Sequence, residues 1–175
     1  MTSETGPGGG APRFIEPRIV VGVDGSPISM RALTWAADEA QRRGAVLEVV
    51  HVDFSRQEVL EALAEDMLEA EQLVLRRVVA QAEALAPGIR VVGQIYDPPA
   101  GQALIAASQG AEMLVVGTRG LSGLRELALG SVSTECARHA RCPVVIIGPN
   151  VSPRKPTANA EVVTVSSAGP NKYPQ

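Results

Sequence analysis

Short apolar runs alternate with longer amphipathic stretches between about residues 17 and 149. Continuous runs rich in Val and Ile are typical of strands buried on both faces of a sheet, and here they cover 18–24, 46–52, 89–96, 112–117 and 143–148. The intervening stretches carry helix caps or apolar residues three and four apart, and they predict helices over 27–43, 57–85, 98–109 and 131–139. We therefore predict an α/β fold: a five-stranded, mainly parallel, Rossmann-like sheet with helices on both faces.

Two of the predicted helices have features that can be checked in detail. Ser26-Pro27 reads as an N-cap followed by proline at the first helical position, and Gly44 reads as the C-terminal stop. In the long second helix one stripe at helical spacing is predicted to face the sheet, with Glu and Arg on the opposite side; its members are Leu60, Leu63, Met67, Val74, Val78 and Leu85.

The ends of the chain differ in composition from its centre. Residues 1–16 form a Gly- and Pro-rich leader and residues 150–175 a polar tail, so we expect one domain over 17–149 with disordered ends. Within the tail, residues 161–166 (EVVTVS) either dock on a sheet edge or stay disordered, and we favour disorder.

Charge, hydropathy and cysteine content indicate the cellular compartment and the kinds of partner. The net charge is −3 and the pI about 5.4, which does not favour a nucleic-acid-binding surface. The apolar runs are far shorter than the roughly 20 residues that span a membrane, and the first residues do not resemble a signal peptide. Cys136 and Cys142 lack the spacing of a metal site and read as structural thiols of a reducing compartment. We expect a cytoplasmic protein.

A glycine- and serine-rich segment follows the fourth predicted strand. Gly117-Thr118-Arg119-Gly120 is separated by nine residues from Gly130-Ser131-Val132-Ser133, which opens the fourth predicted helix. Phosphate binding needs converging backbone N–H donors without Cβ atoms in the way. Glycine supplies positive φ and close approach, and a helix N-terminus supplies donors and a favourable dipole. The hydroxyls of Ser131 and Ser133 can add two more donors. Each glycine alone fits an ordinary turn, with Ser131 as a helix cap. Their combination where a strand leads into a helix favours a phosphate loop.

The sequence lacks two common nucleotide-binding motifs. A Walker A loop needs Gly-Lys followed by Ser or Thr, and the chain contains no Gly-Lys pair. The dinucleotide fingerprint G-x-G-x-x-G is absent after the first strand, where VGVDGS stands.

The spacing Gly117-x2-Gly120-x9-Gly130-Ser131, together with Val23-Asp24-Gly25-Ser26 after the first strand, resembles the ATP-binding subgroup of the universal stress protein family. The resemblance covers roughly residues 17–149, and it implies an adenine nucleotide α-hydrolase-like fold. It also implies that the chain binds ATP, with Mg²⁺ as an accompanying ion, and that the nucleotide contacts Gly22, Val23, Asp24, Val52, Val116, Gly117, Arg119, Gly120, Gly130, Ser131, Val132 and Ser133.

The resemblance implies individual roles as well. Asp24 would lie against the ribose or hold the metal, Val52 would hold adenine through its backbone, and the Gly130–Ser133 segment would hold the phosphates. Family members pair their fifth strands edge to edge, which implies a homodimer through Val144–Ile147. A bare Val-Val-Ile-Ile edge invites pairing on general grounds too.

Some residues allow two interpretations. Asp24 either contacts ligand or caps the next helix, and Arg119 either binds phosphate or lies in solvent. His51 is either catalytic or, as we favour, a hydrogen-bonded histidine of the core or rim. No general base stands out near the loop, so we expect ATP-dependent regulation under stress with at most weak hydrolysis. A slow ATPase, a cAMP- or AMP-binding module and a dimeric scaffold with an incidental ligand are the alternatives.

Overall fold

The computed structural model describes residues 16–53, 61–118 and 129–151, with side chains omitted for 61–68. In chain order the elements are β1 (Arg18–Gly22), α1 (Pro27–Arg43), β2 (Val46–Val52), α2 (Glu61–Leu85), β3 (Val91–Tyr96), α3 (Ala100–Ala107), β4 (Met113–Gly117), α4 (Ser131–His139) and β5 (Val144–Ile147). The predicted leader and most of the predicted tail, including residues 161–166, lie outside the described residues.

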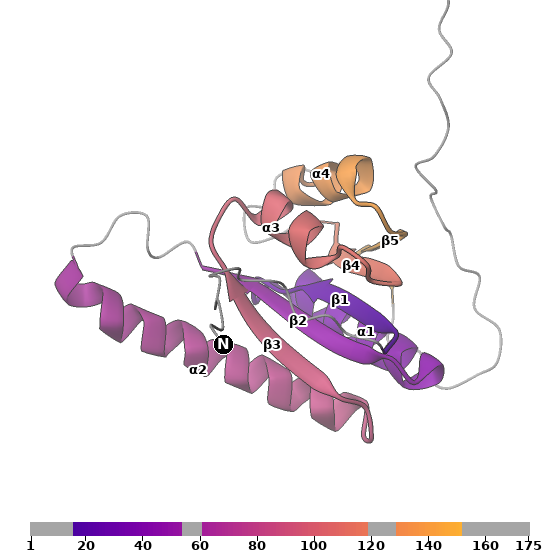
Figure 1. Ribbon diagram of the computed structural model, residues 1–175, viewed down its shortest axis with the longest axis horizontal. Helices are drawn as coiled ribbons and strands as arrows, with labels where there is room; N and C mark the ends of the chain where they lie inside the picture. Colours follow the sequence, from indigo (N-terminus) through magenta and orange to yellow (C-terminus); the bar gives the residue numbers. More distant parts are fainter. Residues whose placement is uncertain (1–15, 54–60, 119–128, 152–175) are drawn as a thin grey trace, which may run out of the picture.

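The five strands form one parallel sheet in the order β3-β2-β1-β4-β5. Helices α1 and α2 cover one face and α3 and α4 the other (Figure 1). Each face has its own apolar core: Ile19, Val21 and Leu47 pack under α1, while Val20, Val50 and Leu114 pack under α3 and α4. The central strands are buried on both faces, which explains their continuous apolar sequences. The predicted fold class is confirmed.

The predicted ends of α1 are also confirmed. The Oγ of Ser26 accepts a hydrogen bond from the Ser29 amide at 3.2 Å, and Pro27 occupies the first helical position. Gly44 ends the helix with φ of 62°, in the left-handed region that favours glycine. Both signals are local, so tertiary packing had no reason to override them.

The predicted inner face of α2 is wrong in part. Val74 and Leu85 are 40% and 39% exposed, while Leu75, Val78, Val79 and Ala82 pack against the sheet. Leu73, Val74 and Leu75 are consecutive, so two apolar stripes at helical spacing compete and the periodicity cannot choose between them.

Gly93 in the middle of β3 explains which stripe of α2 faces inward. A Cβ placed on Gly93 would lie 2.8 Å from Cγ2 of Val79 and 3.0 Å from Cγ of Leu75. The missing side chain therefore leaves room for these two residues, and their close approach fixes the rotation of the helix against the sheet.

The order of the strands marks one place on the sheet as special. The chain runs from β1 outward through β2 to β3, then crosses back to β4 and continues to β5 at the other edge. Helices therefore leave the neighbouring strands β1 and β4 toward opposite faces (Figure 1). In open parallel sheets ligands bind beyond the carboxyl ends of the strands at such a reversal.

Candidate ligand-binding rim

The carboxyl ends of β1, β2 and β4 meet at this rim, as parallel pairing requires. Gly22 of β1 is in register with Val50 of β2, and Val21 with Val115 of β4. The segments that follow these strands therefore emerge side by side. The strand ends and the residues directly after them contain the candidates Gly22, Val23, Asp24, Val52, Val116 and Gly117. The segment Gly130–Ser133 comes to the rim in a different way.

The N-terminus of α4 is tied to the end of β4 by the carbonyl of Thr118. This oxygen accepts hydrogen bonds from the Gly130 amide at 2.7 Å and from the Ser133 hydroxyl at 3.1 Å. The two ends of the predicted phosphate loop are thereby held together. Arg119 and Gly120, the other candidate residues of the loop, lie outside the described residues.

The first turn of α4 presents backbone donors. Gly130 is the N-cap residue and has no side chain, no side-chain cap is formed, and the first turn carries no acidic residue. Because the first amides of a helix have no intrahelical acceptor, the N–H groups of Ser131, Val132 and Ser133 can serve an anion. The Ser131 side chain is exposed beside them.

Two expectations about this loop need correction. The Ser133 hydroxyl, predicted as a phosphate donor, lies on a residue only 2% exposed and is within hydrogen-bond distance of the carbonyls of Thr118 and Gly130. Only its backbone amide remains a candidate. Gly117 is the last residue of β4, and Gly130 has φ of −67°. Neither is left-handed, so a positive φ is not what requires glycine at these two positions.

Sequence reasoning did not single out Thr118 itself. Its Oγ1 is buried and has no hydrogen-bond partner in the described part of the chain. An unsatisfied buried hydroxyl costs about 1–3 kcal/mol. The position directly before the loop, together with this open hydrogen-bonding capacity, makes the hydroxyl a candidate ligand contact.

The turn after β1 is held by its own polar groups. Oδ1 of Asp24 accepts a hydrogen bond from the Ser26 amide at 3.0 Å, and the Asp24 amide donates to Oγ of Ser29 at 3.3 Å. Asp24 thus stabilises the turn that leads into α1. This local role and a role in ligand contact are compatible, because a carboxylate accepts more than one hydrogen bond.

The apolar candidates at the rim offer backbone rather than side chains. Val23, Val52 and Val116 are at most 9% exposed and pack into the two cores. Gly22 has a packing reason of its own, since a Cβ there would lie 2.9 Å from two methyl carbons of Leu104 in α3.

His51 near the end of β2 is hydrogen-bonded on both ring nitrogens, as we favoured over a catalytic role. Its Nδ1 lies 2.8 Å from the carbonyl oxygen of Val23, and its Nε2 lies 2.7 Å from Oε2 of Glu71. The histidine therefore links the turn after β1 to helix α2.

The two thiols are poor nucleophiles. Burial raises the pKa of Cys136 to about 12 from an ordinary 9.0, and burial also raises that of Cys142. Within residues 16–53, 61–118 and 129–151 no group of three or more His, Cys, Asp or Glu side chains is arranged to hold a metal ion. None of the described helices is both long and apolar enough to cross a membrane.

These features define a Rossmann-like α/β domain with its candidate ligand site at the carboxyl rim of a parallel sheet. The model of the universal stress protein family matches residues 17–148. A universal stress protein of Mycobacterium tuberculosis is 33% identical over 154 residues, covering 88% of this chain and 56% of that protein. The chain belongs to the universal stress protein family. It spans about half the length of the curated relatives it matches.

Solved structures agree with this assignment. A universal stress protein in complex with cAMP is 25% identical, with a TM-score of 0.59 and coverage of 75% of this chain and 97% of that one. The universal stress protein of Archaeoglobus fulgidus in complex with dAMP is 27% identical, with a TM-score of 0.58 and coverage of 77% and 99%.

Proposed function

We propose that this domain binds ATP at the rim formed by β1, β2, β4 and the N-terminus of α4, and that binding regulates a stress response. One observation carries the proposal: the Thr118 carbonyl joins the end of β4 to the first turn of α4. The uncapped amides of that turn thereby lie at the sheet reversal, where a polyphosphate is favoured by both donors and dipole.

The adenosine part of the ligand is assigned to the other two strands. Gly22 and Val23 line the adenine side, and Val52 contributes backbone groups, since the side chains of both valines are buried. Asp24 contacts the ribose or, through the phosphates, a Mg²⁺ ion. A magnesium ion bound with a nucleotide takes only one or two protein carboxylates, and one carboxylate in this turn fits that pattern.

The phosphates are assigned to the loop. Gly117, Arg119 and Gly120 contact the phosphates and ribose together with Val116, and the amides from Gly130 to Ser133 hold the phosphates. The Thr118 hydroxyl is added to this set because it is buried without a partner among the described residues.

The ligand class has a specific second candidate. The two universal stress protein structures described above, at 25% and 27% identity, are complexes with cAMP and dAMP. A monophosphate would use the same amides at the start of α4. Titration of the protein with ATP in the presence of cAMP or AMP separates the candidates: ATP should bind in the micromolar range, about −8 kcal/mol, and cAMP should compete only weakly. Stronger binding of cAMP than of ATP would reassign the site.

Binding without rapid turnover is the favoured activity. Hydrolysis needs a positioned water and stabilisation of transition-state charge. Of the two described carboxylates that follow β1 and β2, Asp24 is held in the β1–α1 turn and Asp53 is fully buried. A slow ATPase is the alternative. Single-turnover incubation decides: ATP should remain intact for hours, whereas phosphate release that disappears in Asp24→Ala would establish the ATPase.

The assembly and setting of the domain are part of the proposal. Residues 17–149 act as one unit between a leader and a tail, in the cytoplasm and without nucleic-acid or membrane partners. β5 is an edge strand whose second side is unpaired in the described sheet, and two copies joined through Val144–Ile147 would satisfy those backbone groups. Sedimentation should give a homodimer. The carbonyls of Pro143 and Ile147 accept hydrogen bonds from the β4 side, so the alternate residue Ile146 points its N–H to the free edge, and Ile146→Pro, which removes that donor, should give a monomer.

A further inference from the structure

The bridge made by His51 connects helix α2 to the proposed nucleotide rim. The two acceptors of its ring lie in different elements: the Val23 carbonyl follows β1, and the Glu71 carboxylate belongs to α2. Figure 1 shows α2 along β3 on the face that it shares with α1. The bridge is therefore a polar link between this outer helix and the turn that contains Asp24.

The number of protons in the bridge follows from its geometry. A carbonyl oxygen only accepts, so Nδ1 must carry a hydrogen to bond Val23 at 2.8 Å. An ionised carboxylate also only accepts, so Nε2 must carry a second hydrogen to bond Glu71 at 2.7 Å. Both bonds together need one proton more than a neutral imidazole and an ionised carboxylate contain.

Loss of that proton breaks one of the two bonds. If the hydrogen stays on Nδ1, the lone pair of Nε2 faces the Glu71 carboxylate and α2 loses its polar link to β2. If it stays on Nε2, the lone pair of Nδ1 faces the Val23 carbonyl and the turn after β1 loses its support. Histidine is the side chain suited to such a change near neutral pH.

Within the described residues, the charged groups next to the bridge along the chain are two aspartates. Asp24 directly follows Val23, and Asp53 follows β2 two residues beyond His51. On β3 the residue in register with His51 is Ile95, which carries no charge. Glu71 is the described charged group in hydrogen-bond contact with the ring.

We propose that His51 is a positioning residue whose protonation, clamped by Glu71, holds the Val23–Asp24 turn and so tunes nucleotide affinity with pH. The affinity part of this inference rests on the proposed nucleotide site. With the extra proton the turn and α2 are fixed in one arrangement and nucleotide binds more tightly. Without it the ring loses its bond either to the Val23 carbonyl or to Glu71, the arrangement is no longer fixed, and binding weakens, by about fivefold or more if the coupling has an ordinary size.

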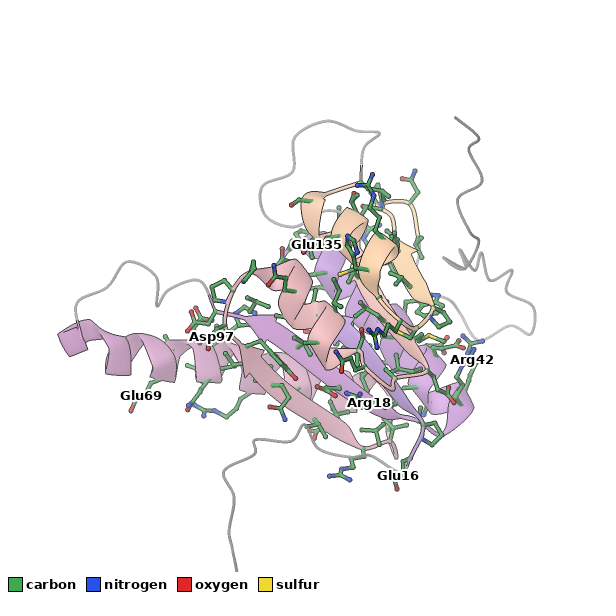
Figure 2. All side chains as sticks on the ribbon, turned by 45° about the horizontal axis from the view of Figure 1, so that its top comes forward. Glu16, Arg18, Arg42, Glu69, Asp97 and Glu135 are labelled. Carbon is green, nitrogen blue, oxygen red and sulfur yellow. The ribbon has the colours of Figure 1, made fainter. Side chains whose placement is uncertain are left out.

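Glu71→Gln is the informative variant. An amide can donate to Nε2 of a neutral imidazole that keeps its Nδ1 hydrogen for Val23, so both bonds form without the extra proton. Its affinity should therefore stay high at all pH values from 5.5 to 8.5. Glu71→Ala should give low affinity at all of them. Glu69→Gln is the matched control, because Glu69 lies on the same helix with its side chain pointing away from the sheet (Figure 2).

The test combines a ligand-free and a ligand-bound measurement in a His139→Gln background, which leaves His51 as the only histidine. Without nucleotide, NMR follows the ring nitrogens of His51 together with the Val23 carbonyl and Asp24 amide against pH. With ATP, calorimetry gives the dissociation constant at each pH. Because the phosphates of ATP also titrate, affinities are expressed relative to Glu71→Gln at the same pH, which removes the ligand's own contribution.

In the Glu69→Gln control, the Val23 and Asp24 signals should change with pH together with the ring nitrogens of His51, and in Glu71→Gln they should not. The affinity for ATP relative to Glu71→Gln should fall as pH rises, with the same midpoint as the NMR signals. Signals at Val23 and Asp24 that ignore the ring, or equal titration in both variants, would overturn the inference. If the signals follow the ring but ATP binds at no pH, the proposed nucleotide site fails and the proton-dependent link stands. If ATP binds with no change in relative affinity, the link does not regulate the site.

Discussion

The ion pair between Arg18 and Glu48 allows a stability prediction of known sign and size. Arg18 at the start of β1 is 9% exposed and Glu48 on β2 is 1% exposed, and their side chains form a salt bridge. The Arg18 guanidinium also donates to the carbonyls of Ala107 at 2.9 Å and Gln109 at 2.7 Å. Figure 2 shows Arg18 at the sheet, far from Glu135 of α4. The group therefore fixes the end of α3 to the sheet.

Arg18→Met should destabilise the domain strongly. The substitution leaves the buried Glu48 carboxylate without its cation and two carbonyls without a donor. Removing one partner of a buried pair costs about 3–5 kcal/mol, against a total stability of roughly 5–15 kcal/mol. With a urea m-value of about 2 kcal/mol/M, the unfolding midpoint should fall by about 2 M.

The double variant Arg18→Met/Glu48→Met tests the physical cause. It removes both charges, and replacing a buried pair by apolar side chains is often neutral or stabilising. Urea unfolding should show the double variant at least about 2 kcal/mol more stable than Arg18→Met alone. Arg90→Met is the matched control, because Arg90 and Glu16 form an exposed pair whose side chains are 65% and 63% accessible; it should change stability by at most about 1 kcal/mol. Equal stability of the single and double variants would refute the reasoning.

Three further outcomes are expected. Thr118→Val should leave the free energy of unfolding unchanged or raise it, since an unsatisfied hydroxyl is removed, while calorimetry shows weaker nucleotide binding; unchanged affinity would remove the hydroxyl from the site. Burial, with a smaller contribution from the Glu48 charge, raises the pKa of Tyr96 above 10.0. In a Tyr173→Phe background, the absorbance change of Tyr96 at 295 nm should therefore have its midpoint above pH 10.0. Glu48→Gln should move that midpoint to lower pH. Because the folded state then binds more protons than the unfolded state above pH 10, stability should fall as the pH rises through that range. Cys136 has a pKa of about 12 against 9.0 for an ordinary thiol, so its thiolate fraction at pH 8 should be about a thousandfold lower. Cys136 should therefore react slowly with iodoacetamide in the native protein. Rapid labelling would contradict its burial.

Local signals made much of the fold predictable. The cap at Ser26, the stop at Gly44 and the continuous apolar strands each depend on nearby residues, and all three agree with the structure. The rotation of α2 was not predictable in the same way. It depends on Gly93, which is distant in sequence and leaves space for Leu75 and Val79.

In the candidate site, too, local features were predictable and contacts between distant residues were not. The glycines and serines of the loop are recognisable in the sequence, and the position of Gly130 at the start of α4 was predictable from its neighbours. The Ser133 hydroxyl was misassigned because its acceptor, the Thr118 carbonyl, comes close only once β4 and α4 have packed together. The link from His51 to Glu71 also joins residues on different elements, and no spacing along the chain reveals it.

The account depends most directly on the backbone amides at the start of α4, and one pair of variants isolates them. Proline is tolerated at the first position of a helix, so Ser131→Pro should keep α4 folded while removing one N–H donor. Ser131→Ala removes only the hydroxyl. Loss of a hydrogen bond to a charged group costs about 1.5–3 kcal/mol, so calorimetric titration with ATP should show Ser131→Pro weakened by about tenfold or more relative to Ser131→Ala at equal stability. Equal affinities of the two variants for ATP would show that the start of α4 does not hold the phosphates.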